Sequence, residues 1–137
     1  MTKAEVRALT KEEAGQIYER FYWQPCGGPR LAPGIDAVVF DWAVHSGPSR
    51  AIRALQKVLS LDIDGAPGPA LSRAVQKADP VQTIHSLCRE RRMFLGRLKG
   101  FAVFGRGWSR RVDALEKMAI ARAHNATRTK AASSLVK

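Results

Sequence analysis

The stretch from Val38 to Pro48, V-V-F-D-W-A-V-H-S-G-P, constrains the fold of this chain more than any other. Its first seven residues are apolar except for Asp41. The apolar segment from Asp36 to Ser46 is long for a buried strand, and Gly47-Pro48 is a break at which one helix ends and the next begins. We therefore predict a buried helix over 36–46. A buried carboxylate is tolerated only when it is paired, so Asp41 needs a partner.

Helical periodicity and helix-start signals continue along the chain. Thr10-Lys11-Glu12-Glu13 has the capping-box pattern, and Asp79-Pro80 supplies a cap followed by proline in the first turn. The pattern predicts helices over 10–24, 36–46, 48–59, 69–77, 80–99 and 107–124. Alternating strand patterns bounded by hairpin turns are lacking, so we predict an all-α domain of about six helices over 1–124. Residues 125–137 are expected to form a basic frayed tail, because they offer little apolar material to pack.

Positive charge is concentrated in the second half of the chain. The net charge is +11; residues 1–68 hold eight basic and eight acidic residues, whereas residues 69–137 hold fifteen and four. Such a field attracts polyanions, including nucleic acid and anionic envelope polymers. We predict that Arg89, Arg92, Arg110 and Arg111 form a polyanion-binding surface.

Arg91 is a second charge on an apolar helical face, because it falls in the stripe formed by Ile84, Leu87, Cys88 and Leu95. The leading interpretation is a structural ion pair between Asp41 and Arg91. The alternative is that Asp41 lines a cleft as the second carboxylate of a glycosidase, where it would hold water or stabilise an oxocarbenium-like transition state.

Several motifs carry a family resemblance. The segments A-G-Q-I-Y-E-R-F-Y-W-Q-P, F-D-W-A-V-H-S-G, L-Q-K-V-L-S-L-D-I-D-G-A-P-G-P-A-L and F-G-R-G-W-S-R-R-V occur in this order. Together they resemble the C-terminal, peptidoglycan-binding-like portion of the glycoside hydrolase family 108 N-acetylmuramidases. The resemblance implies a lysozyme-like helical fold and peptidoglycan glycan strands as the partner. The family's catalytic glutamate lies in an E-G-G-Y-type motif, which this sequence does not contain.

We therefore expect a peptidoglycan-binding, muramidase-like domain without hydrolytic activity in this form. Candidate glycan-binding residues are Trp23, Tyr18, His45 and Trp42, since aromatic rings serve as platforms for sugars; at helical spacing, Tyr18 and Trp42 could instead belong to the core. One alternative is an active endolysin-type N-acetylmuramidase that uses Asp41. The other is a basic nucleic-acid-binding or assembly protein.

The sequence predicts no cofactor and no metal site, because its histidines and cysteines lack metal-ligand spacing. Cys26 and Cys88 are expected to be buried free thiols, with a single disulfide as the alternative. We expect an apolar surface near Ile17, Phe21 and Val38 that a second copy of the chain or a missing N-terminal segment shields. No stretch reaches the roughly 20 apolar residues of a membrane span, and Met1 starts no secretory signal, so synthesis in the cytoplasm and action at the periplasm or cell wall are expected.

Overall fold

The structure, a computed structural model, describes residues 11–98 and 101–136, without the side chains of Tyr18, 101–104 and 129–136. The predicted cap at Thr10 lies outside these residues. The elements in chain order are α2 (Lys11–Tyr18), the π-helix η1 (Glu19–Trp23), the 3-10 helix η2 (Gly28–Arg30), α3 (Ile35–Ser46), α4 (Pro48–Val58), α5 (Pro69–Lys77), α6 (Pro80–Gly96) and α7 (Phe101–Val136). No strand occurs among the described residues, and the all-α prediction is confirmed.

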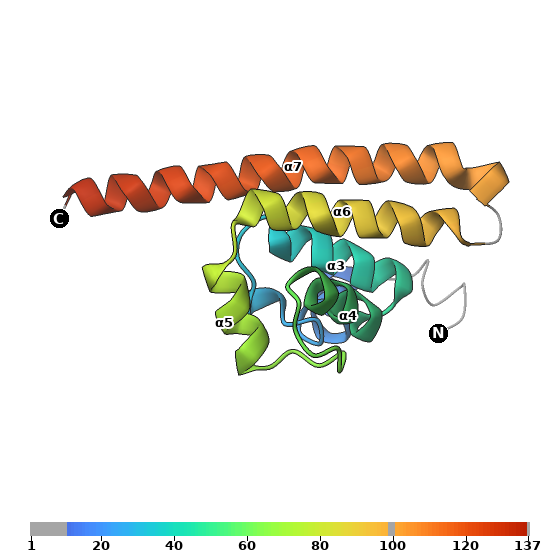
Figure 1. Cartoon of the computed structure of the whole chain (residues 1–137), viewed down its shortest axis with the longest axis horizontal. Coiled ribbons are helices and arrows are strands. Elements are labelled where there is room, and N and C mark those ends of the chain that lie inside the picture. The colour runs from blue at the N-terminus through green and yellow to red at the C-terminus, as the bar shows by residue number, and fades with distance from the viewer. Residues whose placement is uncertain (1–10, 99–100, 137) are drawn as a thin grey trace.

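Helix α3 is the centre of the molecule. It contacts η1, η2, α4, α6 and α7, and it buries Ile35, Val38, Val39, Trp42 and Ala43. The predicted buried helix is thereby confirmed, because every residue from 35 to 44 is buried or half-buried. Helices α6 and α7 pack side by side along one edge of the molecule, with α3 beneath them (Figure 1).

Helix α7 is longer than the sequence pattern predicts. It runs for 36 residues, begins before Gly107 and does not end at His124 (Figure 1). Alanines at 126, 131 and 132 have high helix propensity, so the helix can continue where apolar residues for packing become sparse. The division of the chain into a domain over 1–124 and a tail over 125–137 stays a prediction.

Gly34 allows the start of α3 to meet two other helices closely. Its φ is +95°, and a Cβ atom there would lie 2.5 Å from the backbone oxygen of Ala119 and 2.8 Å from Cδ1 of Ile84. Both distances are too short for a side chain, so only glycine fits. The backbone N–H of Gly34 donates to Oδ1 of Asp36 at 3.0 Å, which fixes the turn into α3.

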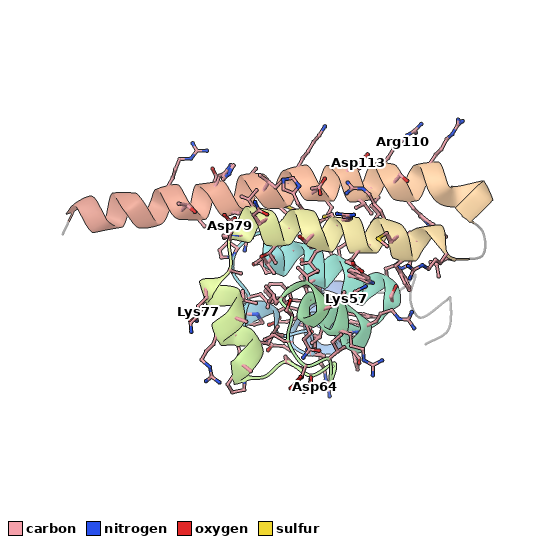
Figure 2. The ribbon with its side chains drawn as sticks, viewed as in Figure 1. Lys57, Asp64, Lys77, Asp79, Arg110 and Asp113 are labelled. Carbon is pink, nitrogen blue, oxygen red and sulfur yellow. The ribbon has the colours of Figure 1, made fainter. Side chains whose placement is uncertain are left out.

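The loop between α4 and α5 is held by Gln56. Its buried side chain donates to Oδ1 of Asp64 at 2.7 Å and accepts from the Gly65 N–H at 2.9 Å. Asp64 also accepts from the Ala66 N–H at 2.9 Å, and Gly65 has a φ of +75°. These bonds make a structural turn on the molecule's periphery, where Figure 2 labels Asp64.

The cap of α6 is confirmed, because Oδ1 of Asp79 accepts from the Gln82 N–H at 3.1 Å.

The predicted apolar surface near the N-terminus needs a correction. Phe21 is 56% exposed, whereas Val38 is fully buried in the core because α3 is covered on that side. Whether a second copy or another segment covers Phe21 stays a prediction.

Candidate functional site

An open groove of about 530 Å³ lies where η1, α3 and α7 meet. It contains an aromatic pair, Trp23 and Phe40, and an ion pair, Asp36 and Arg122. Its lining consists of Gly15, Glu19, Trp23, Asp36, Ala37, Phe40, Met118 and Arg122. Of the predicted glycan-binding residues, Trp23 lies in this groove.

The π-helix positions Trp23. The Gln24 N–H donates to the Glu19 carbonyl at 2.9 Å, a bond across five residues that widens the helix directly after α2. The indole meets the Phe40 ring edge-on, with centroids 5.5 Å apart and planes at 78°. On another side it lies against Gly28, where a Cβ atom would be 2.4 Å from the ring. The half-buried indole is therefore held in one orientation.

Asp36 and Arg122 form an ion pair in the lining of the groove. Arg122 donates from Nε to Oδ1 at 3.1 Å and from Nη2 to Oδ2 at 2.8 Å. Oδ1 also accepts from the backbone N–H groups of Gly34 and Ala37. Asp36 raises the pKa of Arg122 through these hydrogen bonds and its charge. Asp36 thus accepts four hydrogen bonds, while about half of the Arg122 side chain remains exposed to solvent.

Asp41 lies on α3 outside the groove lining, between two arginines. Arg91 Nη1 donates to its Oδ2, and Arg111 Nη2 donates to its Oδ1 at 2.7 Å. Burial raises the pKa of Asp41, but the hydrogen bond from Arg111 and the charge of Arg91 outweigh burial, so the pKa lies below its usual value. This carboxylate is therefore ionised at neutral pH and has both oxygens engaged, which suits an ion pair and not a general acid.

The other candidate glycan-binding residues do not gather around Trp23. Trp42 is 3% exposed and packs on Phe94 with ring centroids 5.9 Å apart, so it belongs to the core and cannot present its face to a sugar. His45 is exposed at the end of α3, where Nδ1 lies 2.6 Å from the Ser46 hydroxyl and the ring meets Trp108 edge-on. Burial and the nearby charges of Arg91 and Arg111 lower the pKa of His45. The side chain of Tyr18 lies outside the described ones.

The predicted polyanion surface divides into two kinds of arginine. Arg92 binds Asp113 at 2.6 Å and Glu116 at 3.0 Å, and Arg111 binds Asp41, so both serve internal ion pairs. Arg89 and Arg110 are exposed, and neither forms an ion pair with another described residue. Figure 2 shows Arg110 pointing away from the body of the molecule.

Both cysteines are free and buried. Burial raises the pKa of Cys26, and burial together with the charge of Glu116 raises that of Cys88 to about 12.

Among the residues that the structure describes, no cluster of His, Cys, Asp and Glu could hold a metal ion. None of the described helices has the length and apolarity to span a bilayer.

Sequence reasoning missed the pairing of Asp36 with Arg122 and the π-helix before Trp23. Asp36 stands at a helix start, where an acidic residue is ordinary, and Arg122 stands between two alanines with no acidic residue within one helical turn. The two are 86 positions apart, so no local spacing links them.

Comparison with known proteins places the chain in a family. The family model for glycosyl hydrolase 108 matches residues 1–47, which include Trp23, Asp36 and Phe40. A solved structure, that of SagA from Brucella abortus, is 41% identical and superimposes with a TM-score of 0.85, covering 90% of this chain and 71% of SagA. No curated protein matches the sequence. This chain belongs to glycoside hydrolase family 108, as a muramidase-like domain with a lysozyme-like helical fold.

Proposed function

We propose that this chain binds the glycan strands of peptidoglycan in the Trp23 groove and does not cut them by itself. The observation that carries the proposal is that the fixed indole of Trp23 and the Asp36–Arg122 pair line the same open groove. An aromatic ring offers an apolar surface to the C–H face of a pyranose. Charged donors and acceptors in the same groove suit hydroxyl and acetamido groups.

Fixed geometry also favours binding, because little ordering is needed when the sugar arrives. Phe40 and Gly28 hold the indole, and two backbone amides together with Arg122 hold the Asp36 carboxylate. Preorganised groups lose less conformational entropy on binding than mobile ones do. The family relationship supplies the class of polymer that the groove would meet.

The carboxyl groups near the groove argue against catalysis by this chain alone. Glycoside hydrolysis needs a carboxylic acid with a raised pKa across the sugar from a second carboxylate. The pKa values of Asp41 and Glu116 are lowered by their arginine partners, which outweigh the opposing effect of burial, and Asp36 is engaged by Arg122. Hydrolysis would therefore need an acid other than these three, such as one supplied by the family's E-G-G-Y-type segment.

The binding proposal is tested by co-sedimentation with purified cell-wall sacculi. Trp23→Leu keeps an apolar side chain but removes the aromatic face, and we expect binding about tenfold weaker, which corresponds to about 1.4 kcal/mol. Phe21→Leu is the matched control, because Phe21 belongs to the same π-helix but does not line the groove. If both variants bound sacculi as tightly as the unmodified protein, the Trp23 groove would not be the glycan-binding site.

A turbidity assay on the same sacculi tests the absence of hydrolysis. We expect no clearing with the chain alone and clearing when an E-G-G-Y-type segment is added in cis or as a fragment. General acid catalysis contributes on the order of 10²- to 10⁴-fold, so its loss is easily measured. Clearing by the unmodified chain that Asp41→Asn abolishes, with helicity intact, would instead make Asp41 catalytic and the chain an endolysin-type enzyme.

The basic charge leaves nucleic-acid binding as a competing function to be tested. Salt-dependent retention on DNA without retention on sacculi would favour it over the peptidoglycan proposal. We place the site of action at the periplasm or cell wall, where peptidoglycan is found.

A further inference from the structure

A second and larger groove, of about 1170 Å³, lies between the η2 loop, α5 and the later part of α7. Figure 1 shows α5 and the projecting end of α7 at the same end of the molecule. The lining consists of Pro29, Arg30, Leu31, Ala32, Pro33, Pro69, Ser72, Arg73, Val75, Gln76, Ala78, Pro80, Ala123, Ala126 and Thr127. The two grooves share no lining residue.

The walls of this groove are rigid and apolar. Four prolines line it, and proline has a fixed φ and no backbone N–H, so these walls lose little freedom when a ligand binds. Leu31 and Val75 are buried beneath it, and the alanines at 32, 78, 123 and 126 leave room for small side chains. A ligand with small apolar groups would fit such a surface.

The charge of the groove has one sign. Arg30 and Arg73 are both exposed in the lining, and neither forms an ion pair with another described residue. The lining contains no carboxylate, and Ser72 and Gln76 add polar groups beside Arg73. An anionic ligand is therefore favoured over a neutral or cationic one, since guanidinium groups bind carboxylates with two hydrogen bonds.

We propose that this groove binds the acidic stem peptide of peptidoglycan, with its carboxylates at Arg30 and Arg73 and its alanine methyl groups over Leu31 and Val75. The proposal rests on the proposed function, because it assigns a second part of the same polymer to a second site. Arg122 and Ala123 are neighbours on α7 and line one groove each. The grooves thus adjoin across this helix.

The distance across α7 suits such a division. Consecutive residues of a helix point about 100° apart, and on a helix about 10–12 Å wide this corresponds to an arc of about 9–10 Å along its surface. Four extended residues reach about 13 Å. A tetrapeptide attached to a sugar in the Trp23 groove is therefore long enough to reach around the helix into the second groove.

The free tetrapeptide L-Ala-D-Glu-meso-diaminopimelate-D-Ala is the probe, titrated into the protein by isothermal calorimetry. We expect saturable binding that Arg73→Glu weakens at least tenfold. Arg97→Glu makes the same change in net charge at the far end of α6 from Pro80 and should leave the dissociation constant unchanged. Ala126→Phe fills the groove without changing charge and should also weaken binding, with circular dichroism verifying the fold of each variant.

The outcomes separate this proposal from the proposed function, because a tetramer of N-acetylglucosamine is titrated into the same samples. Saccharide binding without tetrapeptide binding would contradict the stem-peptide proposal for the second groove and leave the glycan proposal for the Trp23 groove unaffected. Tetrapeptide binding that Arg73→Glu and Ala126→Phe do not weaken would overturn it as well. Tetrapeptide binding with the expected losses supports it, whatever the saccharide does.

Discussion

Arg122 holds Asp36 through two hydrogen bonds, from Nε to Oδ1 at 3.1 Å and from Nη2 to Oδ2 at 2.8 Å, and so joins α7 to the first turn of α3. Asp36 is 5% exposed, so its charge depends on this partner and on the backbone amides of Gly34 and Ala37. Removal of the guanidinium would leave a buried charge with fewer partners.

Arg122→Gln is therefore expected to lower the free energy of unfolding by about 1–3 kcal/mol, the usual cost of an unsatisfied buried polar group. Urea unfolding followed by circular dichroism measures the loss. Arg110→Gln on the same helix is the control and should change stability by no more than about 0.5 kcal/mol, because Arg110 is exposed and forms no ion pair with another described residue. Equal stability of the two variants would contradict a structural role for the pair.

Gly34→Ala tests the close approach of three helices. The new Cβ would meet the Ala119 carbonyl and Ile84, so we expect a loss of about 2–5 kcal/mol from backbone strain and overpacking together. Gly47→Ala is a matched control, since its φ of +97° is strained in the same way but nothing lies within 4 Å of the new atom. Thermal unfolding should show the larger loss for Gly34→Ala; the reverse order would contradict the packing argument.

The stability of the fold should fall in acid because of Asp41. Its folded pKa lies below the ordinary value of 3.8, so the unfolded chain binds the proton first as the pH falls. The contribution of Asp41 to the free energy of unfolding is fully present above about pH 5 and is lost as the pH falls through 3.8 to the pKa of the folded state. Unfolding curves from pH 7 to pH 2 should show a shallower acid slope for Asp41→Asn. Because that variant also leaves buried Arg91 without its partner, the slopes and not the absolute stabilities are compared.

The exposed basic residues of α7 should govern how binding to sacculi depends on salt. Arg106, Arg110, Lys117 and Arg128 recur at helical spacing on one exposed face, and none forms an ion pair within the described part of the chain. Arg110→Glu should weaken co-sedimentation at low salt, with no difference from the unmodified protein at half-molar salt. Arg92→Glu should instead destabilise the fold, because Arg92 binds Asp113 and Glu116. Binding that half-molar salt leaves unchanged would contradict an electrostatic contribution.

The two thiols should be unreactive in the folded protein. Burial raises the pKa of both, and only the thiolate reacts at a useful rate. A colorimetric thiol reagent at pH 8 should detect little native thiol and two thiols per chain in urea. Two thiols missing in urea without reductant would indicate a disulfide.

The sequence predicts the helices well where caps and apolar periods agree. Asp79 and Pro80 mark the start of α6 through local chemistry, and the apolar run around Trp42 marks α3 as the buried helix. The charges of Asp41 and Arg91 could be paired from sequence because each interrupts an apolar face. The additional bond from Arg111 could not, because Arg111 lies in a basic run that looks solvent-facing.

The Trp23 groove is formed by residues that are far apart in the sequence, so no short sequence motif predicts it. Trp23 reaches the groove because the π-helix changes the direction of the chain after α2. A single added residue in a helix turn leaves little trace in the apolar spacing of the sequence. Trp42 has the same residue type and a similar apolar surrounding, yet α6 covers it through Phe94. Aromatic residues in helices therefore cannot be sorted into core and ligand-binding ones until the neighbouring helices are placed.

The two ion pairs between α3 and α7 also have a consequence for the order in which the helices associate during folding. Asp41 and Arg111 are 70 residues apart, and Asp36 and Arg122 are 86 apart, whereas α6 and α7 are consecutive and can pair early as a local hairpin. Contacts between residues far apart in the sequence form late, because the entropy lost in closing a long loop precedes the stabilising contacts that offset it. We therefore expect the α6–α7 hairpin to dock onto α3 late in folding, so that during synthesis Asp36 lacks its guanidinium partner until α7 has been made.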